Sequence, residues 1–126
     1  MVVLDTHVVV WWASDPRLLS SRAARAISRA DRLGIPAIVF WETSLLVRKR
    51  KLDLGMSVHE WAANIQAIPR VDPLPLTADI ALLADSLNIH ADPVDRFIVA
   101  TAIHHGVAVV TKDRLLRPLR IVKTIW

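Results

Sequence analysis

With 126 residues, the chain is long enough to bury one hydrophobic core and too short for two ordinary domains. We therefore expect a single domain over residues 1–126. Hydrophobic residues make up 53% of the chain, yet no apolar run approaches the ~18 to 20 residues that a membrane helix needs. The start, MVVLDTH, has an acid at Asp5 and no basic segment before its apolar residues, which argues against a signal peptide. We therefore expect neither a membrane-spanning segment nor a signal peptide.

The net charge and the absence of cysteine further limit the classes of protein to which this chain can belong. A formal net charge of +4 is a mild attraction toward polyanions such as nucleic acids. The chain has no cysteine, so disulfide frameworks and thiolate metal sites are excluded. A reducing compartment suits such a chain, and we expect a cytoplasmic protein.

The first predicted elements are a strand at Val2–Leu4, which ends at Asp5, and a helix over Ser20–Arg32 with helical apolar spacing. The outer face of that helix carries four arginines at spacings of three and four, namely Arg22, Arg25, Arg29 and Arg32. Such residues share one helical face. That face is either a solvated surface or an RNA-contacting one, and both interpretations stay open.

The middle of the chain alternates in the same way. Gly34 and Pro36 are residues that commonly interrupt helices and strands. Ile35–Phe40 is typical of a second strand, and Trp41–Leu52 is typical of a helix with a basic last turn. A further helix is expected over Ser57–Ile68.

In the second half, Val71–Leu76 contains two prolines, so it is either an edge strand or a loop. A helix is expected over Thr77–Leu87 with Thr77 as its N-cap. Apolar runs at Val107–Val110 and Ile121–Ile125 predict two last strands.

The stretch HADPVDRFIVATA, residues 90–102, has two acids at the head of an apolar run. Asp92, Pro93 and Asp95 fit the N-cap, the first and the third positions of a helix. Asp95 also shares a face with Ile98 and Val99, which turns it toward the protein body. Asp92 is therefore expected to be structural.

Strands alternating with helices predict an α/β protein with a mostly parallel sheet and helices on both faces. Ligand sites in such sheets lie outside the carboxyl ends of the strands. Asp5 and Asp113 each follow a predicted strand closely, so both belong at that edge. Glu42 shares a face with Leu45 and Leu46, which directs it inward.

Each of these acids also has an ordinary structural explanation. Asp5 could be a turn residue, and Glu42 an acid in the first turn of a helix. Asp95 could complement the helix dipole, and Asp113 could cap a short helix at residues 114–116. Taken one by one, these explanations do not account for the position of the acids as a group. Several of them occur where the expected topology brings distant segments of the chain together.

Clustered carboxylates without histidine or cysteine partners are hard oxygen ligands that select Mg²⁺ or Mn²⁺. Such ions lower the pKa of a bound water and stabilise the charge of a phosphodiester during displacement. The cluster therefore predicts phosphodiester hydrolysis. The five histidines do not form a ligand set, although His7 stands beside Asp5; the others are His59, His90, His104 and His105.

Four segments, in this order, resemble the PIN-domain ribonucleases, and within them the VapC-type toxins of toxin-antitoxin pairs. They are VVLDTHVVVWW, FWETSLLVRKRKL, HADPVDRFIVATA and VAVVTKDRLL. Together they span nearly the whole chain.

The resemblance implies a three-layer α/β/α sandwich and a Mg²⁺- or Mn²⁺-dependent endoribonuclease site. It assigns the catalytic, metal-binding acids to Asp5, Glu42, Asp95 and Asp113. It also implies supporting roles for Thr6, Thr111 and Asp92. The partners that it implies are an RNA substrate, a second copy of the chain and a cognate antitoxin protein whose tail occupies the cleft.

Two other functions compete with this one. An aspartyl-phosphate phosphotransferase would use Asp5 and Lys112, but the sequence DTH offers no second acid just after Asp5. A catalytically silent module of the same fold would dock RNA or a protein without binding a metal.

Overall fold

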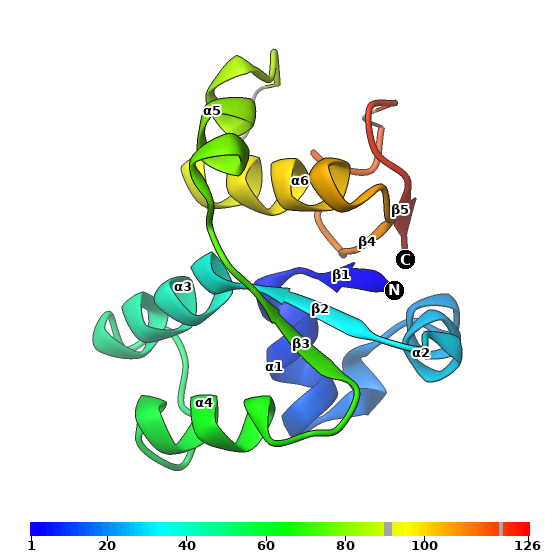
Figure 1. Ribbon diagram of the computed structural model, residues 1–126. Helices are drawn as coiled ribbons and strands as arrows, with labels where there is room; N and C mark the ends of the chain where they lie inside the picture. The colour runs from blue at the N-terminus through cyan, green and yellow to red at the C-terminus, as the bar shows by residue number, and fades with distance from the viewer. Residues whose placement is uncertain (90–91, 119) are drawn as a thin grey trace.

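The computed structural model describes residues 1–89, 92–118 and 120–126. Figure 1 shows strands in the middle of the molecule with helices packed around them. In chain order the elements are β1 (Val2–Leu4), α1 (Thr6–Ser14), the 3-10 helix η1 (Pro16–Leu18), α2 (Ser21–Arg29), β2 (Leu33–Pro36), α3 (Ala37–Arg48), α4 (Val58–Gln66), β3 (Val71–Leu74), α5 (Ala78–Ser86), α6 (Pro93–His105), β4 (Val109–Val110) and β5 (Thr124–Ile125).

The sheet has five strands in the order β3-β2-β1-β4-β5, and each pairing between neighbours in the described chain is parallel. Val3 stands opposite Gly34 on β2 and Val109 on β4. The parallel order requires each connection to cross over the sheet, which places helices on its faces. The prediction of an α/β fold with a parallel sheet is confirmed.

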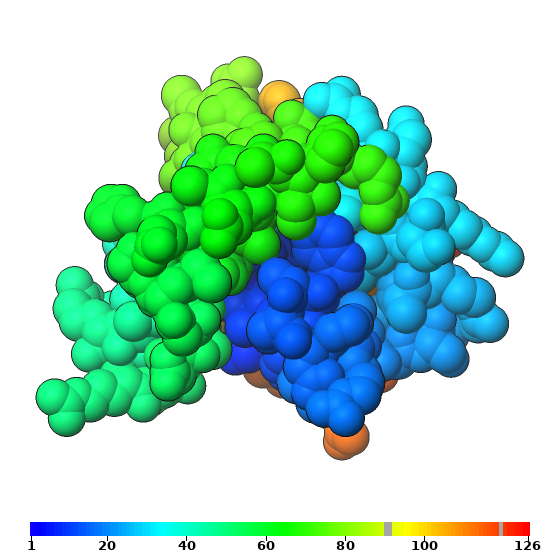
Figure 2. Space-filling model, turned by 90° about the horizontal axis from the view of Figure 1, so that it is seen from below, coloured from blue at the N-terminus to red at the C-terminus, as the bar shows by residue number. Residues whose placement is uncertain are grey.

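The helices form a layer on each side of the sheet, as the three-layer prediction required. Figure 1 shows α5 and α6 on one side, α1, α2 and α4 on the other, and α3 at the flank. The core between the layers contains fully buried Leu4, Ile35 and Ile98. In Figure 2, the face seen from below shows the green residues of α4 beside the blue residues of α1.

Four predicted helix starts are confirmed by their caps. The side chains of Ser20, Ser57, Thr77 and Asp92 each accept a hydrogen bond from a backbone N–H three residues further on. Ser57 and Glu60 complete a reciprocal capping box. These local bonds satisfy N–H groups that have no partner within the helix.

Helix α1 was not predicted from the sequence. Its segment THVVVWWAS contains three valines, which have stiff side chains and modest helix propensity. The helix forms because Asp5 caps it and because Val8, Val9 and Val10 are buried in the core. Burial here outweighs intrinsic propensity.

The predicted boundary between the second strand and its helix is wrong. Strand β2 ends at Pro36, and α3 begins at Ala37 instead of Trp41. A short apolar run such as IVF fits a buried strand and a buried helix equally well, so periodicity alone does not separate them. Glu42 consequently lies in the second turn of α3, and the first-turn explanation for this acid is also wrong.

Helix α2 is shorter than predicted, ending at Arg29. The guanidinium of Arg70 donates to the carbonyl oxygens of Ile27 and Ala30, each at 2.8 Å, and so satisfies groups left free at the helix end. Arg32 lies beyond the helix and pairs with Asp72 on the neighbouring edge strand. The four arginines therefore do not form one helical face.

The remaining differences concern short segments. Val71–Leu74 is an edge strand, one of the two alternatives for that stretch. Strands β4 and β5 are each two residues long, shorter than predicted. The segment after Asp113 forms turns in place of a short helix. Among the described residues, no helix has both the length and the apolar character to cross a bilayer.

Candidate active site

A cleft of about 430 Å³ opens at the carboxyl end of the sheet. Its lining comes from segments far apart in the sequence and consists of Asp5, His7, Trp11, Glu42, Asp92, Asp95, Lys112 and Asp113. The structure thus brings together all four acids that the resemblance assigned to the site. Asp92 joins them as a fifth carboxylate at the wall.

Asp5 is the most deeply placed of the acids, with 7% of its surface exposed. It follows β1 and caps α1, its Oδ1 accepting from the Thr6 N–H at 2.6 Å. Its Oδ2 accepts from the Thr111 hydroxyl at 2.7 Å. Burial raises the pKa of this carboxyl, while the bonds from Thr111 and Thr6 partly offset that rise. Asp5 is therefore held by both oxygens in one orientation.

Thr111 connects two of the acids. Besides donating to Asp5, its hydroxyl oxygen accepts from the Asp113 N–H at 2.9 Å. Asp113 is half-buried, and its Oδ1 accepts from the Leu115 N–H at 2.8 Å. The supporting position predicted for Thr111 is thus a fully buried link between the ends of β1 and β4.

Glu42 reaches the cleft from α3 and is half-buried. Burial is the largest cause that raises the pKa of its carboxyl, and the charges of Asp5 and Asp92 add to it. The Thr6 hydroxyl is near enough to lower this pKa. Among the described residues, that fully buried hydroxyl oxygen has no partner at hydrogen-bond distance. Thr6 therefore faces the acids with unused bonding capacity.

The two acids at the head of α6 occupy different environments. Asp92 is exposed, and its Oδ1 accepts from the Asp95 N–H at 3.0 Å as an N-cap. Asp95 is half-buried, and burial together with the charges of Asp92, Asp5, Asp113 and Glu42 raises its pKa to about 8. Like charges confined in one cleft disfavour ionisation of each other. The positive charge near the cluster, from His7 and Lys112, therefore does not balance its five carboxylates.

One part of the lining was not predicted from the sequence. Trp11 is half-buried in α1 and stands between His7, at 5.6 Å between ring centroids, and Trp126, at 6.0 Å. The Lys112 Nζ lies 5.4 Å from the centre of the Trp11 ring. The signal that could have found this part is helical spacing, since Trp11 lies four residues after His7, the residue that stands beside Asp5 in the sequence.

The donor set fits a divalent cation by its chemistry. Five carboxylates line one cleft, and hard oxygen ligands of this kind suit Mg²⁺ and Mn²⁺. Within the described ranges, no three acidic or histidine side chains already stand in a metal-holding arrangement.

Of the four histidines that the structure describes, one lines the cleft and three lie outside it. His7 lines the cleft, and its charge lowers the pKa of Asp5 and of Glu42. His104 and His105 lie at the end of α6 with ring centroids 5.2 Å apart, and His59 is exposed on α4. His90 lies outside the described residues.

A three-layer parallel α/β fold with clustered acids at the carboxyl end of its sheet is the architecture that the sequence resemblance implied. The family model of the PIN domain matches residues 2–120, and the chain belongs to this family. It is 39% identical over 129 aligned positions to Ribonuclease VapC22 of Mycobacterium tuberculosis, covering 99% of this chain and 98% of that protein. The resemblance to VapC-type proteins is thereby confirmed.

Solved structures with low sequence identity share the fold. A toxin-antitoxin complex from Klebsiella pneumoniae matches with a TM-score of 0.69 at 18% identity, covering 97% of this chain and 95% of that one. VapBC2 of Rickettsia felis, bound to a DNA fragment from its promoter, matches with a TM-score of 0.68 at 15% identity, covering 98% and 97%. VapC20 of Mycobacterium tuberculosis, a toxin that cleaves the sarcin-ricin loop, gives 0.62 at 22% identity, covering 86% and 87%.

Proposed function

We propose that this protein is an endoribonuclease that hydrolyses phosphodiester bonds in RNA and acts as the toxin of a toxin-antitoxin pair. The observation that carries the proposal is the convergence of Asp5, Glu42, Asp95 and Asp113, from four separate segments, on one cleft. The relationship to Ribonuclease VapC22 along almost the full chain supports the reaction class.

The four acids are the proposed ligands of Mg²⁺ or Mn²⁺. When bound there, the ion supplies a water of lowered pKa and stabilises the charge that develops on the phosphodiester. The raised pKa values of Asp5, Glu42 and Asp95 support this assignment, because a cation relieves the repulsion that causes them in part.

The remaining groups prepare the site for the reaction. The hydrogen bonds from Thr6 and Thr111 fix Asp5, so its carboxylate does not need to be ordered when the ion arrives. The Thr6 hydroxyl, which has no hydrogen-bond partner among the described residues, is available to a water or a phosphate oxygen beside Glu42. Asp92 orders the start of α6 and thereby the backbone of Asp95.

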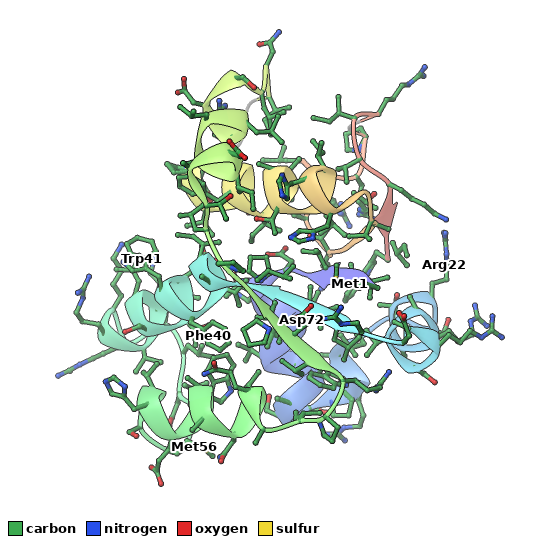
Figure 3. All side chains as sticks on the ribbon, in the orientation of Figure 1. Met1, Arg22, Phe40, Trp41, Met56 and Asp72 are labelled. Carbon is green, nitrogen blue, oxygen red and sulfur yellow. The ribbon has the colours of Figure 1, made fainter. Side chains whose placement is uncertain are left out.

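Two protein partners complete the proposal, a second copy of the chain and an antitoxin. Large apolar side chains are exposed on two helices, Trp41 on α3 at 55% and Leu82 on α5 at 71%. Figure 3 shows Trp41 projecting from α3 away from the body. A second hollow of about 350 Å³ lies between α1 and α4 and is lined mainly by apolar residues, including Val10, Leu54 and Trp61. Exposed apolar surface of this kind is typical of protein interfaces.

The test of the function is cleavage of RNA by the purified protein in Mn²⁺, with the ends of the fragments mapped in total RNA after brief expression. We expect discrete new ends with the native chain and none with the Asp95→Asn variant. Binding of RNA without cleavage by the native chain would favour the catalytically silent module instead.

A further inference from the structure

The cleft that contains the acids also has an aromatic wall, and the proposed hydrolytic chemistry does not use this wall. Trp11 lines the cleft, with His7 and Trp126 in contact with its ring and the Lys112 ammonium over its face. Resting on the proposed function, we infer that Trp11 is a stacking platform for an unpaired nucleobase next to the scissile phosphate, and that Lys112 then contacts the phosphate backbone.

Charge gives the first reason for a stacking platform. The lining of the cleft contains five carboxylates, and Lys112 is the only lysine or arginine among the described residues that line it. An RNA backbone entering this site therefore gains little electrostatic attraction from the walls. Stacking of a base on an aromatic ring does not depend on charge and tolerates any sequence, because every base has a flat face. Stacking on Trp11 thus supplies binding energy for RNA, whose phosphates the acids repel.

The position of Lys112 gives the second reason. Its ammonium lies 5.4 Å from the Trp11 ring centre, and the residue is exposed. An exposed cation–π contact is weaker than stacking of a base on tryptophan. A base can therefore displace the ammonium from the ring, and the flexible lysine stem lets the charge move to a phosphate oxygen. Lys112 follows directly on Thr111, which holds Asp5, so this movement stays beside the acids.

The platform is held in place by its neighbours. Trp126, after β5, contacts the Trp11 ring at a centroid distance of 6.0 Å and an interplanar angle of 55°. His7 lies one helical turn before Trp11, with its ring 5.6 Å away. A ring that two neighbouring rings hold in place loses little conformational freedom when a base stacks on it. The platform therefore selects unpaired nucleotides, since a base within a duplex has no free face.

The experiment uses the full chain in Mn²⁺ and a short single-stranded RNA that contains the mapped cleavage site. A series of such RNAs carries one abasic nucleotide at each position around the scissile bond. For the native protein we expect one abasic position to raise KM about tenfold with little change in kcat. Trp11→Ala should raise KM on the intact RNA by a similar factor, and the abasic nucleotide should then cause no further loss.

Trp12→Phe is the matched control, because Trp12 neighbours Trp11 on α1 but does not line the cleft. It should keep the full response to the abasic series. Trp11→Phe retains a smaller ring and should give an intermediate KM. In chelator, quenching of tryptophan fluorescence by the intact RNA should persist in Trp12→Phe and be lost in Trp11→Phe.

The outcomes separate the platform from the proposed function. Suppose that the native protein cleaves RNA but Trp11→Ala has the same KM as the native protein; the platform is then refuted and the nuclease function stands. The same holds if Trp11→Ala and the abasic nucleotide each raise KM and their combined effect is the product of the two. If the native protein cleaves no RNA, both are refuted. If Trp11→Ala does not fold, Trp11→Phe decides, and an unchanged KM together with unchanged quenching would overturn the platform.

Discussion

Helices α1 and α6 both begin with an aspartate at the acid cleft, but they assign the roles of helix cap and site acid differently. In α1 the cap and the site acid are one residue, since Asp5 accepts from Thr6 at 2.6 Å and also lines the cleft. In α6 the cap is Asp92, which is exposed, and the more deeply placed acid is Asp95, which lies one turn further on.

At the start of α1 one residue serves both the site and the stability of the helix, whereas at the start of α6 two residues divide these roles. Asp5 is fixed by two hydrogen bonds that exist without any ligand. Among the described residues, no side-chain group donates a hydrogen bond to the Asp95 carboxylate, and it is surrounded by like charges. Variants at the two helix starts should therefore differ in how much cleavage activity and how much folding stability they lose.

The largest effect is expected at Asp5. Replacement by Asn preserves an oxygen that can cap α1, because Asn and Asp are comparable N-caps. It removes the charge, so cleavage should fall by more than the ~10- to 100-fold lost when a group supporting a metal ligand is removed. Cleavage assays in Mn²⁺ and titration calorimetry would check this. Equal Mn²⁺ affinity of Asp5→Asn and the native chain would end the metal assignment for Asp5.

A paired experiment at α6 tests the separation of roles. Asp95→Asn should abolish cleavage and leave or raise the melting temperature in chelator. The rise should be clearest near pH 8 and above, where Asp95 is charged and the change relieves repulsion and the desolvation of a half-buried charge. Asp92→Ala should keep measurable cleavage and lose about 0.5 to 2 kcal/mol of stability, as is typical for an N-cap. Thermal melts and cleavage assays on both variants give the answer. The reverse pattern would exchange the two roles.

The pH dependence of the metal-free protein sharpens the same comparison. Asp95 has a pKa of about 8 in the folded state against an ordinary value of 3.8. The folded state therefore binds its proton more tightly than the unfolded state. This contribution to stability is complete below pH ~4 and is lost as the pH rises toward about 8. Denaturant melts in chelator should show that fall, and Asp95→Asn should flatten it. A native chain whose stability rises steadily over this range would contradict the prediction.

The smallest effect is expected away from both helix starts, on α2. Figure 3 shows Arg22 extending outward from this helix, which also carries the exposed residues Arg25 and Arg29. If this face contacts RNA, replacing the three by Gln should weaken RNA binding and reduce its salt slope by roughly 2. Arg32→Gln is the control, because Arg32 pairs with Asp72. An unchanged slope in the triple variant would assign this face to solvent.

Much of the fold was predictable because its signals are local. The caps at Ser20, Ser57, Thr77 and Asp92 act within three residues, so the sequence alone indicates where these helices start. Buried parallel strands show as apolar runs, which gave the order and the type of most elements. Errors arose where one apolar run fits two structures, as at Ile38–Phe40, and where core burial made a helix of the valines in α1.

For the site, the sequence by itself determined which acids are available and, through the rule for parallel sheets, that Asp5 and Asp113 lie at one edge. Only the tertiary structure decided how they are held. The Thr111 hydroxyl bridges residues that are 106 positions apart, and Glu42 approaches from the second turn of a helix whose start was misplaced. It also decided that Trp11 and Lys112 form a wall of the same cleft. Such contacts depend on distances between elements, and residue spacing along the chain carries no information about those distances.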